Sequence, residues 1–289
     1  MSAPLAAAPA AGRASAWIRA GVLLVLVALA WHRTLTMLWE TWSTNDNYSH
    51  GPLVPATSLA LVWLRRDLVR AIAVRPEPRG LALVALGCLM QVLGVRADVF
   101  ALQGWALLPV LFGLSLAFLG TAMTRMLAFP IGYLGFMLTF PPVVMNTLSF
   151  ALKEVSVSAS AGAAKWAGVA LEREGMSIFL ATGELRVENP CSGLRSLLAL
   201  LATGTLFAYF QPGGAWRRAL VLLAATPIAI LGNAVRLLLV IVAADRRGVM
   251  WASGAFHDWT GYVIYAVALG ALLGLRALLT PRAAKEARS

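Results

Sequence analysis

Long apolar runs dominate this chain and leave it few ways to fold. Eight of them fall at residues 16–32, 51–64, 80–95, 99–120, 124–141, 191–210, 216–243 and 255–279. A helix needs about 20 mostly apolar residues to cross a bilayer, whose interior offers no water to exposed backbone groups. The runs therefore predict an all-α polytopic membrane protein of about eight transmembrane helices. The second and third runs are short for a crossing, and we expect them to borrow flanking residues or to lie tilted.

The composition supports the same fold class. Hydrophobic residues make up 60% of the chain and charged residues 13%, against an apolar share of roughly 45–50% in soluble domains. The predicted crossings account for most of the chain length, so we expect one transmembrane domain over residues 1–289. Residues 1–15 are Ala-rich and are expected to form a flexible tail. An Ala-x-Ala-like cleavage site does not follow the first apolar run, which favours a retained helix over a signal peptide.

The basic residues indicate how the chain is oriented. A net charge of +11 would suggest nucleic acid in a soluble protein, but these residues are not interleaved with exposed aromatic residues, so we exclude a nucleic-acid partner. Lys and Arg in short loops mark the cytoplasmic side instead. With a cytoplasmic N-terminus, the opposite short loops hold only Arg33, Arg96, Arg246 and Arg247. The cytoplasmic side then holds fourteen: Arg13, Arg19, Arg65, Arg66, Arg70, Arg75, Arg79, Arg125, Arg217, Arg218, Arg276, Arg282, Lys285 and Arg288. Both termini, and the tail at residues 1–15, are therefore predicted to be cytoplasmic.

Residues 142–190 form the one long connection between apolar runs. Small and apolar residues at helical spacing over 143–171, with a few charges among them, predict an interfacial helix. Alternating apolar and polar residues over 176–188, around Thr182-Gly183, predict a short β-hairpin. The predicted orientation places this insertion, between helices five and six, on the outer face.

Cys191 stands at the predicted outer end of the sixth helix. Asn189 is a preferred N-cap and Pro190 suits the first helical position, so Cys191 would occupy the second. Free backbone N–H groups and the helix dipole favour a thiolate there. The alternative is a buried cysteine that acts as a small hydrophobic residue. Cys88, by contrast, lies in the middle of the third run, too deep for a disulfide with Cys191, and is expected to pack in the core.

Arg236 lies in the outer half of the seventh run, in the sequence Asn233-Ala234-Val235-Arg236. An ionised arginine inside a span costs at least about 2.5 kcal/mol, so it usually faces a cavity or a partner. Asn233 is one turn earlier on the same helix face. The alternative is an arginine that extends to the membrane interface or holds a neighbouring helix in place.

His257 begins the eighth run, again at the outer end. An imidazole can act as general acid or base near neutral pH. Asp258 is adjacent in sequence and would point elsewhere on a helix, so the two do not form a dyad. The alternative is a structural histidine at the interface.

The segment Asn45 to Pro52, which contains Tyr48 and His50, lies between the first two runs and is also predicted to be outside. Its turn-forming residues fit an ordinary surface loop as well as a substrate contact.

The predicted topology thus brings a thiol, a guanidinium and an imidazole to one depth on one face. These groups suit nucleophilic acyl transfer, in which a thiolate attacks a carbonyl, an imidazole moves protons and a cation steadies the oxyanion. Cys191 and the three histidines show no close chelating spacing. We therefore expect neither a metal nor another cofactor.

At these residues the chain resembles the exosortase/archaeosortase family of membrane cysteine transpeptidases. The matches are Cys191-Ser192-Gly193 at a helix start, Asn233 to Arg236 in the next helix, and Phe256-His257-Asp258 at the start of the last. Tyr48 to Pro52 also resembles the family's N-terminal signature. The Cys191-Ser192-Gly193 motif is preceded here by Asn189-Pro190, where many relatives would have an acidic and a small residue. This difference bears on which subfamily the chain belongs to and which sorting motif it would recognise.

The resemblance implies an enzyme of the bacterial inner membrane with its active site on the periplasmic side. It would cleave exported proteins at a C-terminal signal of the PEP-CTERM type, which consists of a short motif, a transmembrane helix and a basic tail. It would then transfer them to an unknown acyl acceptor, in a setting associated with exopolysaccharide. Cys191 would be the nucleophile, with Arg236 and His257 as its partners. Five further residues would contact the substrate or support these three groups: Tyr48, His50, Ser192, Arg195 and Asn233.

Two other classes of protein remain open from the residues alone. In a transporter or flippase, Arg236 and His257 would line a solute path. In a glycan polymerase, outer-face Arg and His would act on lipid-linked sugars. Both leave Cys191 without a purpose.

The basic-residue distribution generates a topology prediction. Reporter fusions after Arg70, Gly214 and Ser289 should report cytoplasm, and fusions after Asp46 and Gly175 should report the opposite side, because short loops rich in Lys and Arg stay inside. A cytoplasmic signal at Gly175 would put Cys191 on the wrong face and contradict the catalytic hypothesis.

Overall fold

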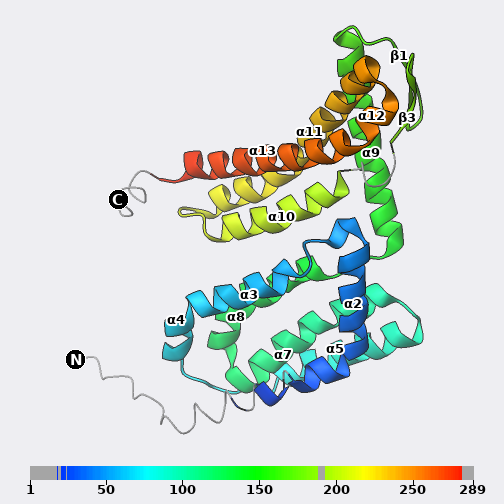
Figure 1. Cartoon of the computed structure of the whole chain (residues 1–289). Coiled ribbons are helices and arrows are strands. Elements are labelled where there is room, and N and C mark those ends of the chain that lie inside the picture. The colour runs from blue at the N-terminus through cyan, green and yellow to red at the C-terminus, as the bar shows by residue number, and fades with distance from the viewer. Residues whose placement is uncertain (1–17, 19–20, 24, 188–192, 282–289) are drawn as a thin grey trace. The chain divides into compact units, whose positions relative to one another are not determined.

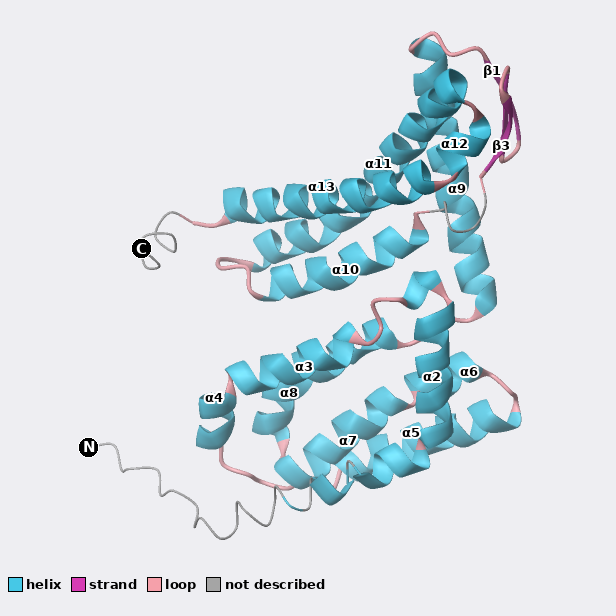
Figure 2. Ribbon diagram, viewed as in Figure 1, coloured by secondary structure: helices cyan, strands magenta, loops and turns pink. Residues whose placement is uncertain are grey.

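The computed structural model describes residues 18, 21–23, 25–187 and 193–281, together with the backbone but not the side chain of Ala255. Helices make up most of it, and the one sheet is small (Figures 1 and 2). The chain forms two compact units, Met1–Pro141 and Pro142–Ser289. The assignment of the whole chain to one domain stays a prediction.

The first unit is built of helices joined by short connections. They are α2 (His32–Thr44), η1 (Asp46–Tyr48), α3 (Leu53–Leu64), α4 (Arg66–Ala71), α5 (Gly80–Arg96), α6 (Phe100–Trp105), α7 (Leu107–Leu119), α8 (Thr121–Tyr133) and η2 (Leu134–Met137). The α5 and α7 helices pack so closely that a Cβ added at Gly113 would lie 2.7 Å from the carbonyl oxygen of Gly80. Such contacts between backbones need glycine and are common between membrane helices.

The close packing of α5 corrects the expectation for Cys88. The buried residues of α5 are Gly80, Gly87 and Gly94, at seven-residue spacing, whereas Cys88 is exposed. Successive residues on a helix point about 100° apart, so Cys88 turns away from the face that Gly87 presents to α7. The prediction of core packing was wrong because glycine, and not the larger apolar residues, makes this interface.

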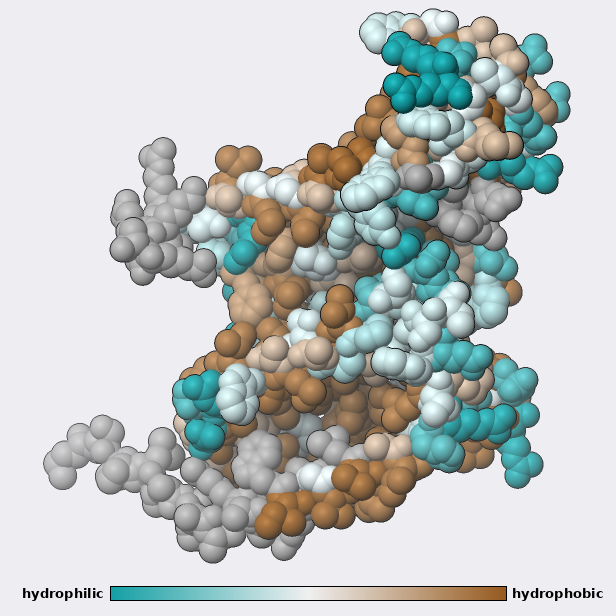
Figure 3. All heavy atoms as spheres, viewed as in Figure 1, coloured by the Kyte–Doolittle hydropathy of each residue, from teal (hydrophilic) through white to brown (hydrophobic). Residues whose placement is uncertain are grey.

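The second unit is a helical bundle with a small sheet at one end (Figure 2). Its elements are α9 (Pro142–Trp166), β1 (Leu171–Glu174), β2 (Ser177–Leu180), β3 (Gly183–Arg186), α10 (Leu194–Tyr209), α11 (Ala215–Arg247), α12 (Val249–Ser253) and α13 (Ala255–Leu279). The α11 helix packs against α9, α10 and α13. Figure 3 shows hydrophilic residues gathered at the end of the unit that carries the sheet and apolar residues along α13. This distribution suits a bundle whose sheet end meets water.

The sheet confirms the predicted hairpin and extends it. Strands β2 and β3 pair antiparallel with Leu180 opposite Gly183, and β1 adds a third antiparallel strand beside β2. The alternation is clear on β2, where Ile178 is fully buried and Phe179 is exposed. The predicted helix before the hairpin is present as α9, which ends five residues earlier than expected, at Trp166.

The apolar runs correspond to helices, but fewer of these are long enough to cross a membrane than predicted. Among the described residues, three helices are long and apolar enough, or up to five if each of two bent helix pairs forms one span. The run at 99–120 supplies one of the three, Phe100–Leu119, whereas α3 and α5 have only 12 and 17 residues. The chain is therefore a multi-pass membrane protein, whereas eight crossings and both termini inside stay predictions.

Candidate active site

The start of α10 differs from the expectation. The helix begins at Leu194, and its N-cap is Gly193, which has a φ of +78°. This left-handed conformation suits glycine and cannot continue into a helix. The described helix therefore begins later than the sixth apolar run, at Leu194, and the predicted N-cap at Asn189 stays a prediction. Asn189, Pro190, Cys191 and Ser192 themselves lie outside the described residues.

Gly193 lies directly against Asn233. A Cβ added at Gly193 would approach the Asn233 side-chain carbon Cγ to 2.6 Å, so only glycine fits beside this amide. Asn233 is buried, and its Nδ2 donates a hydrogen bond to Ser156 Oγ on α9 at 2.9 Å. The backbone that follows Cys191, the middle of α11 and the buried side of α9 therefore meet at one polar side chain.

Arg236 lies one turn beyond Asn233 and reaches the start of α13. Its Nη2 donates a hydrogen bond to the backbone oxygen of His257 at 3.0 Å, and Thr260 Oγ1 donates to the same oxygen at 2.8 Å. A Cβ on Gly261 would lie 2.9 Å from Arg236 Nη2. The half-buried guanidinium is thus held by a carbonyl and accommodated by a glycine.

A small cavity joins these residues. Its lining includes Asn233 and Arg236 from α11, Ser196 from α10, and Gly261 and Tyr265 from α13. Arg195 is exposed, and its neighbour Ser196 is the residue that faces the cavity. His257 is half-buried and Asp258 is exposed, in line with the expectation that the two diverge.

Tyr48 and His50 belong to the first unit. They hold the segment around η1 against the backbone of η2 and of the residues just after it. The Tyr48 hydroxyl accepts a hydrogen bond from Phe140 N at 3.0 Å. His50 Nε2 lies 3.1 Å from Phe136 O, and since a carbonyl only accepts, this nitrogen carries the proton. Burial raises the pKa of Tyr48, although the bond from Phe140 acts in the opposite direction, so the phenol stays neutral at physiological pH.

The polar cluster of the second unit consists of Ser156, Gly193, Asn233, Arg236 and Gly261, and three of these residues were not expected from sequence. Gly193 and Gly261 stand inside or beside the quoted motifs, and a glycine next to a polar motif is a signal of close backbone approach. Ser156 is one of several small residues on α9, and nothing local distinguishes it. Its role depends on which residue of α11 lies opposite.

The comparisons with known proteins agree with the resemblance. A family model described as transmembrane exosortase matches residues 42–274, most of the chain. A search of curated proteins and a search of solved structures found no match. The matched range includes Tyr48, Cys191, Arg236 and His257. The chain therefore belongs to the transmembrane exosortases, a family of membrane cysteine transpeptidases.

Proposed function

We propose that this protein cleaves the C-terminal sorting signals of exported proteins on the outer side of the inner membrane and transfers them to an acyl acceptor. Cys191 is the proposed nucleophile, and Arg236 and His257 are its partners. One observation carries the proposal: Arg236 binds the backbone of His257 while Asn233, one turn away, packs against Gly193. The family match favours this function over a transporter or a glycan polymerase.

The proposal requires Cys191 to reach this cluster. Two residues of extended chain span at most about 7 Å, so Cys191 lies within that reach of Gly193 whatever its conformation. Gly193 itself touches Asn233. This short covalent link to a residue of the cluster supports the proposal that the Cys191 thiolate attacks a substrate carbonyl held at Arg236.

The proposed reaction has two halves. The Cys191 thiolate attacks the scissile carbonyl carbon, and the carbonyl oxygen becomes an oxyanion. The C–N bond then breaks, the leaving amine takes a proton from His257, and a thioester remains. An acceptor amine or water next loses its proton to His257 and attacks the thioester, which releases the Cys191 thiolate and the transferred protein.

Arg236 is the proposed oxyanion donor. Its bond to the His257 carbonyl fixes the plane of the guanidinium before substrate arrives. Donors oriented in advance stabilise a developing negative charge without reorganisation, which is the basis of oxyanion holes. The same bond couples the position of Arg236 to the helix turn that carries the His257 imidazole.

The first prediction of this mechanism is that Cys191→Ala abolishes processing while Cys88→Ala leaves it nearly intact. Cys191 is two residues from Gly193, which touches Asn233, whereas Cys88 lies on the exposed side of α5 in the other unit. The measurement is cleavage of a membrane-tethered substrate by purified protein. Because Cys88 is exposed, trapping of a thioester or labelling by a thiol reagent should be done in the Cys88→Ala background. Full processing by Cys191→Ala would eliminate the acyl-enzyme.

The second prediction is that Arg236→Lys lowers the single-turnover cleavage rate by roughly a hundred- to a thousandfold, the usual effect of losing an oriented donor. Lysine keeps the charge but lacks the planar fork that binds a carbonyl and an oxyanion together. Arg276→Lys is the matched control, because Arg276 Nη2 also donates to a backbone carbonyl, that of Phe210, at the other end of α13. Retention of more than about a third of the rate by Arg236→Lys would assign Arg236 a structural role.

The third prediction concerns Gly261→Ala. The added Cβ would meet the end of the Arg236 side chain, which can move aside, so the fold survives while the guanidinium is displaced. Misplacement by about 1 Å can cost up to a hundredfold in rate, and we expect a fall of roughly ten- to a hundredfold in kcat with little change in KM. Gly270→Ala on the same helix meets nothing within 4 Å and serves as the control. Equal rates for the two variants would refute the positioning role of Gly261.

A further inference from the structure

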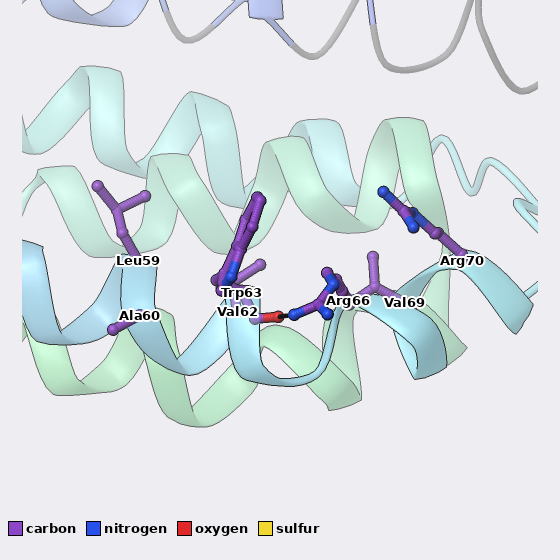
Figure 4. Close-up of a pocket in the computed structure, with 7 residues that line it drawn as sticks. All are labelled: Leu59, Ala60, Val62, Trp63, Arg66, Val69 and Arg70. Carbon is purple, nitrogen blue, oxygen red and sulfur yellow. Dashed lines mark hydrogen bonds between the residues drawn. The ribbon is translucent and has the colours of Figure 1, made fainter.

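We propose that a groove on α3 and α4 binds an anionic phospholipid, with its headgroup at Arg66 and Arg70 and an acyl chain along Leu59, Val62 and Trp63. The groove has a volume of about 640 Å³ and is lined entirely by residues of these two helices. Figure 4 shows Leu59, Trp63, Val69 and Arg70 projecting to the same side of the two helices. The site lies in the first unit and is independent of the proposed catalytic function.

The apolar part of the groove is exposed to a degree that suits contact with lipid. Leu59 and Trp63 have 71% and 66% of their surface accessible, one turn apart on α3. Tryptophan is enriched where the hydrocarbon of a bilayer meets its headgroups. Trp63 is also the second-to-last residue of α3, next to the arginines that follow.

The charged end of the groove is cationic and ordered. The Arg66 guanidinium stacks over the Trp63 ring at 5.2 Å from its centroid, and its Nη1 donates to Trp63 O at 3.4 Å. Arg70 has one acidic neighbour, Asp67, at 3.9 Å, but both side chains are exposed and such pairs are weak. With Arg65 included, residues 65–70 carry three positive charges and one negative charge.

Charge and shape together select the occupant. Guanidinium groups bind phosphate oxygens through paired hydrogen bonds, and arginines beside membrane helices attract anionic lipids. A soluble anion would make no contact with the exposed leucine and indole side chains. The basic tail of a sorting signal would be repelled by the arginines. The arginine distribution of the chain predicts this turn to be cytoplasmic, where it would meet headgroups of the inner leaflet.

The test is native mass spectrometry of the full-length protein released from nanodiscs that contain equal amounts of dioleoyl phosphatidylglycerol and dioleoyl phosphatidylcholine. The wild-type protein should retain phosphatidylglycerol preferentially. Arg66→Gln should weaken this retention about five- to tenfold, since one cation near a lipid headgroup contributes roughly that factor. Arg217→Gln is the control, because Arg217 also stacks over a tryptophan, Trp216, but lines no part of the groove.

Three results would overturn the proposal. They are equal retention of the two lipids by the wild-type protein, an equal effect of Arg217→Gln, and unchanged retention in Trp63→Ser, which would leave a headgroup site without an acyl groove. The three substituted residues lie on or near the surface, so the variants are expected to fold. Monodispersity on gel filtration checks this before lipid is measured.

Discussion

The guanidinium of Arg236 has to be accommodated in a mostly apolar stretch of α11, and the rest of the candidate site depends on the contacts that accommodate it. The cost of an arginine inside a membrane helix is at least about 2.5 kcal/mol on insertion scales. The backbone carbonyl of His257 accepts a hydrogen bond from the guanidinium, and Gly261 leaves room for this group. Because Asn233 is one turn away and touches Gly193, the same arrangement joins α11 to the starts of α10 and α13. Electrostatics and packing therefore bring separate motifs to one place.

Features set by local pattern could be predicted from the sequence. The last two apolar runs, 216–243 and 255–279, correspond closely to α11 and α13, since apolar length alone decides where such helices extend. The β2–β3 hairpin followed from alternation around Gly183. The proximity of Arg236 to the start of α13 was predicted from their common depth in the membrane, and the contact of Arg236 with His257 agrees with it.

Features set by distant neighbours could not be predicted. Strand β1 has a single apolar residue, Leu171, and it is held by pairing with β2 and by an ion pair between Arg173 and Glu154 of α9. The described part of α10 begins at Leu194, later than the sixth apolar run, and its cap Gly193 lies too close to the side chain of Asn233 for any other residue. Burial of Tyr48 likewise depends on the backbone of Phe140, far along the chain. In each case a tertiary contact outweighs the local preference.

The length of α11 has a consequence for where a substrate is cut. Its 33 residues extend about 50 Å along the helix axis, while the hydrocarbon core of a bilayer is about 30 Å thick. Arg236 lies 21 residues beyond Ala215, or about 32 Å along the axis, and α13 measures about the same distance back from His257. With the predicted cytoplasmic ends of both helices at the membrane surface, these lengths would place the polar cluster at the level where hydrocarbon gives way to headgroups. A substrate anchored by its own helix would present there only the few residues that emerge next to its membrane span, so bilayer thickness would help to select the scissile bond.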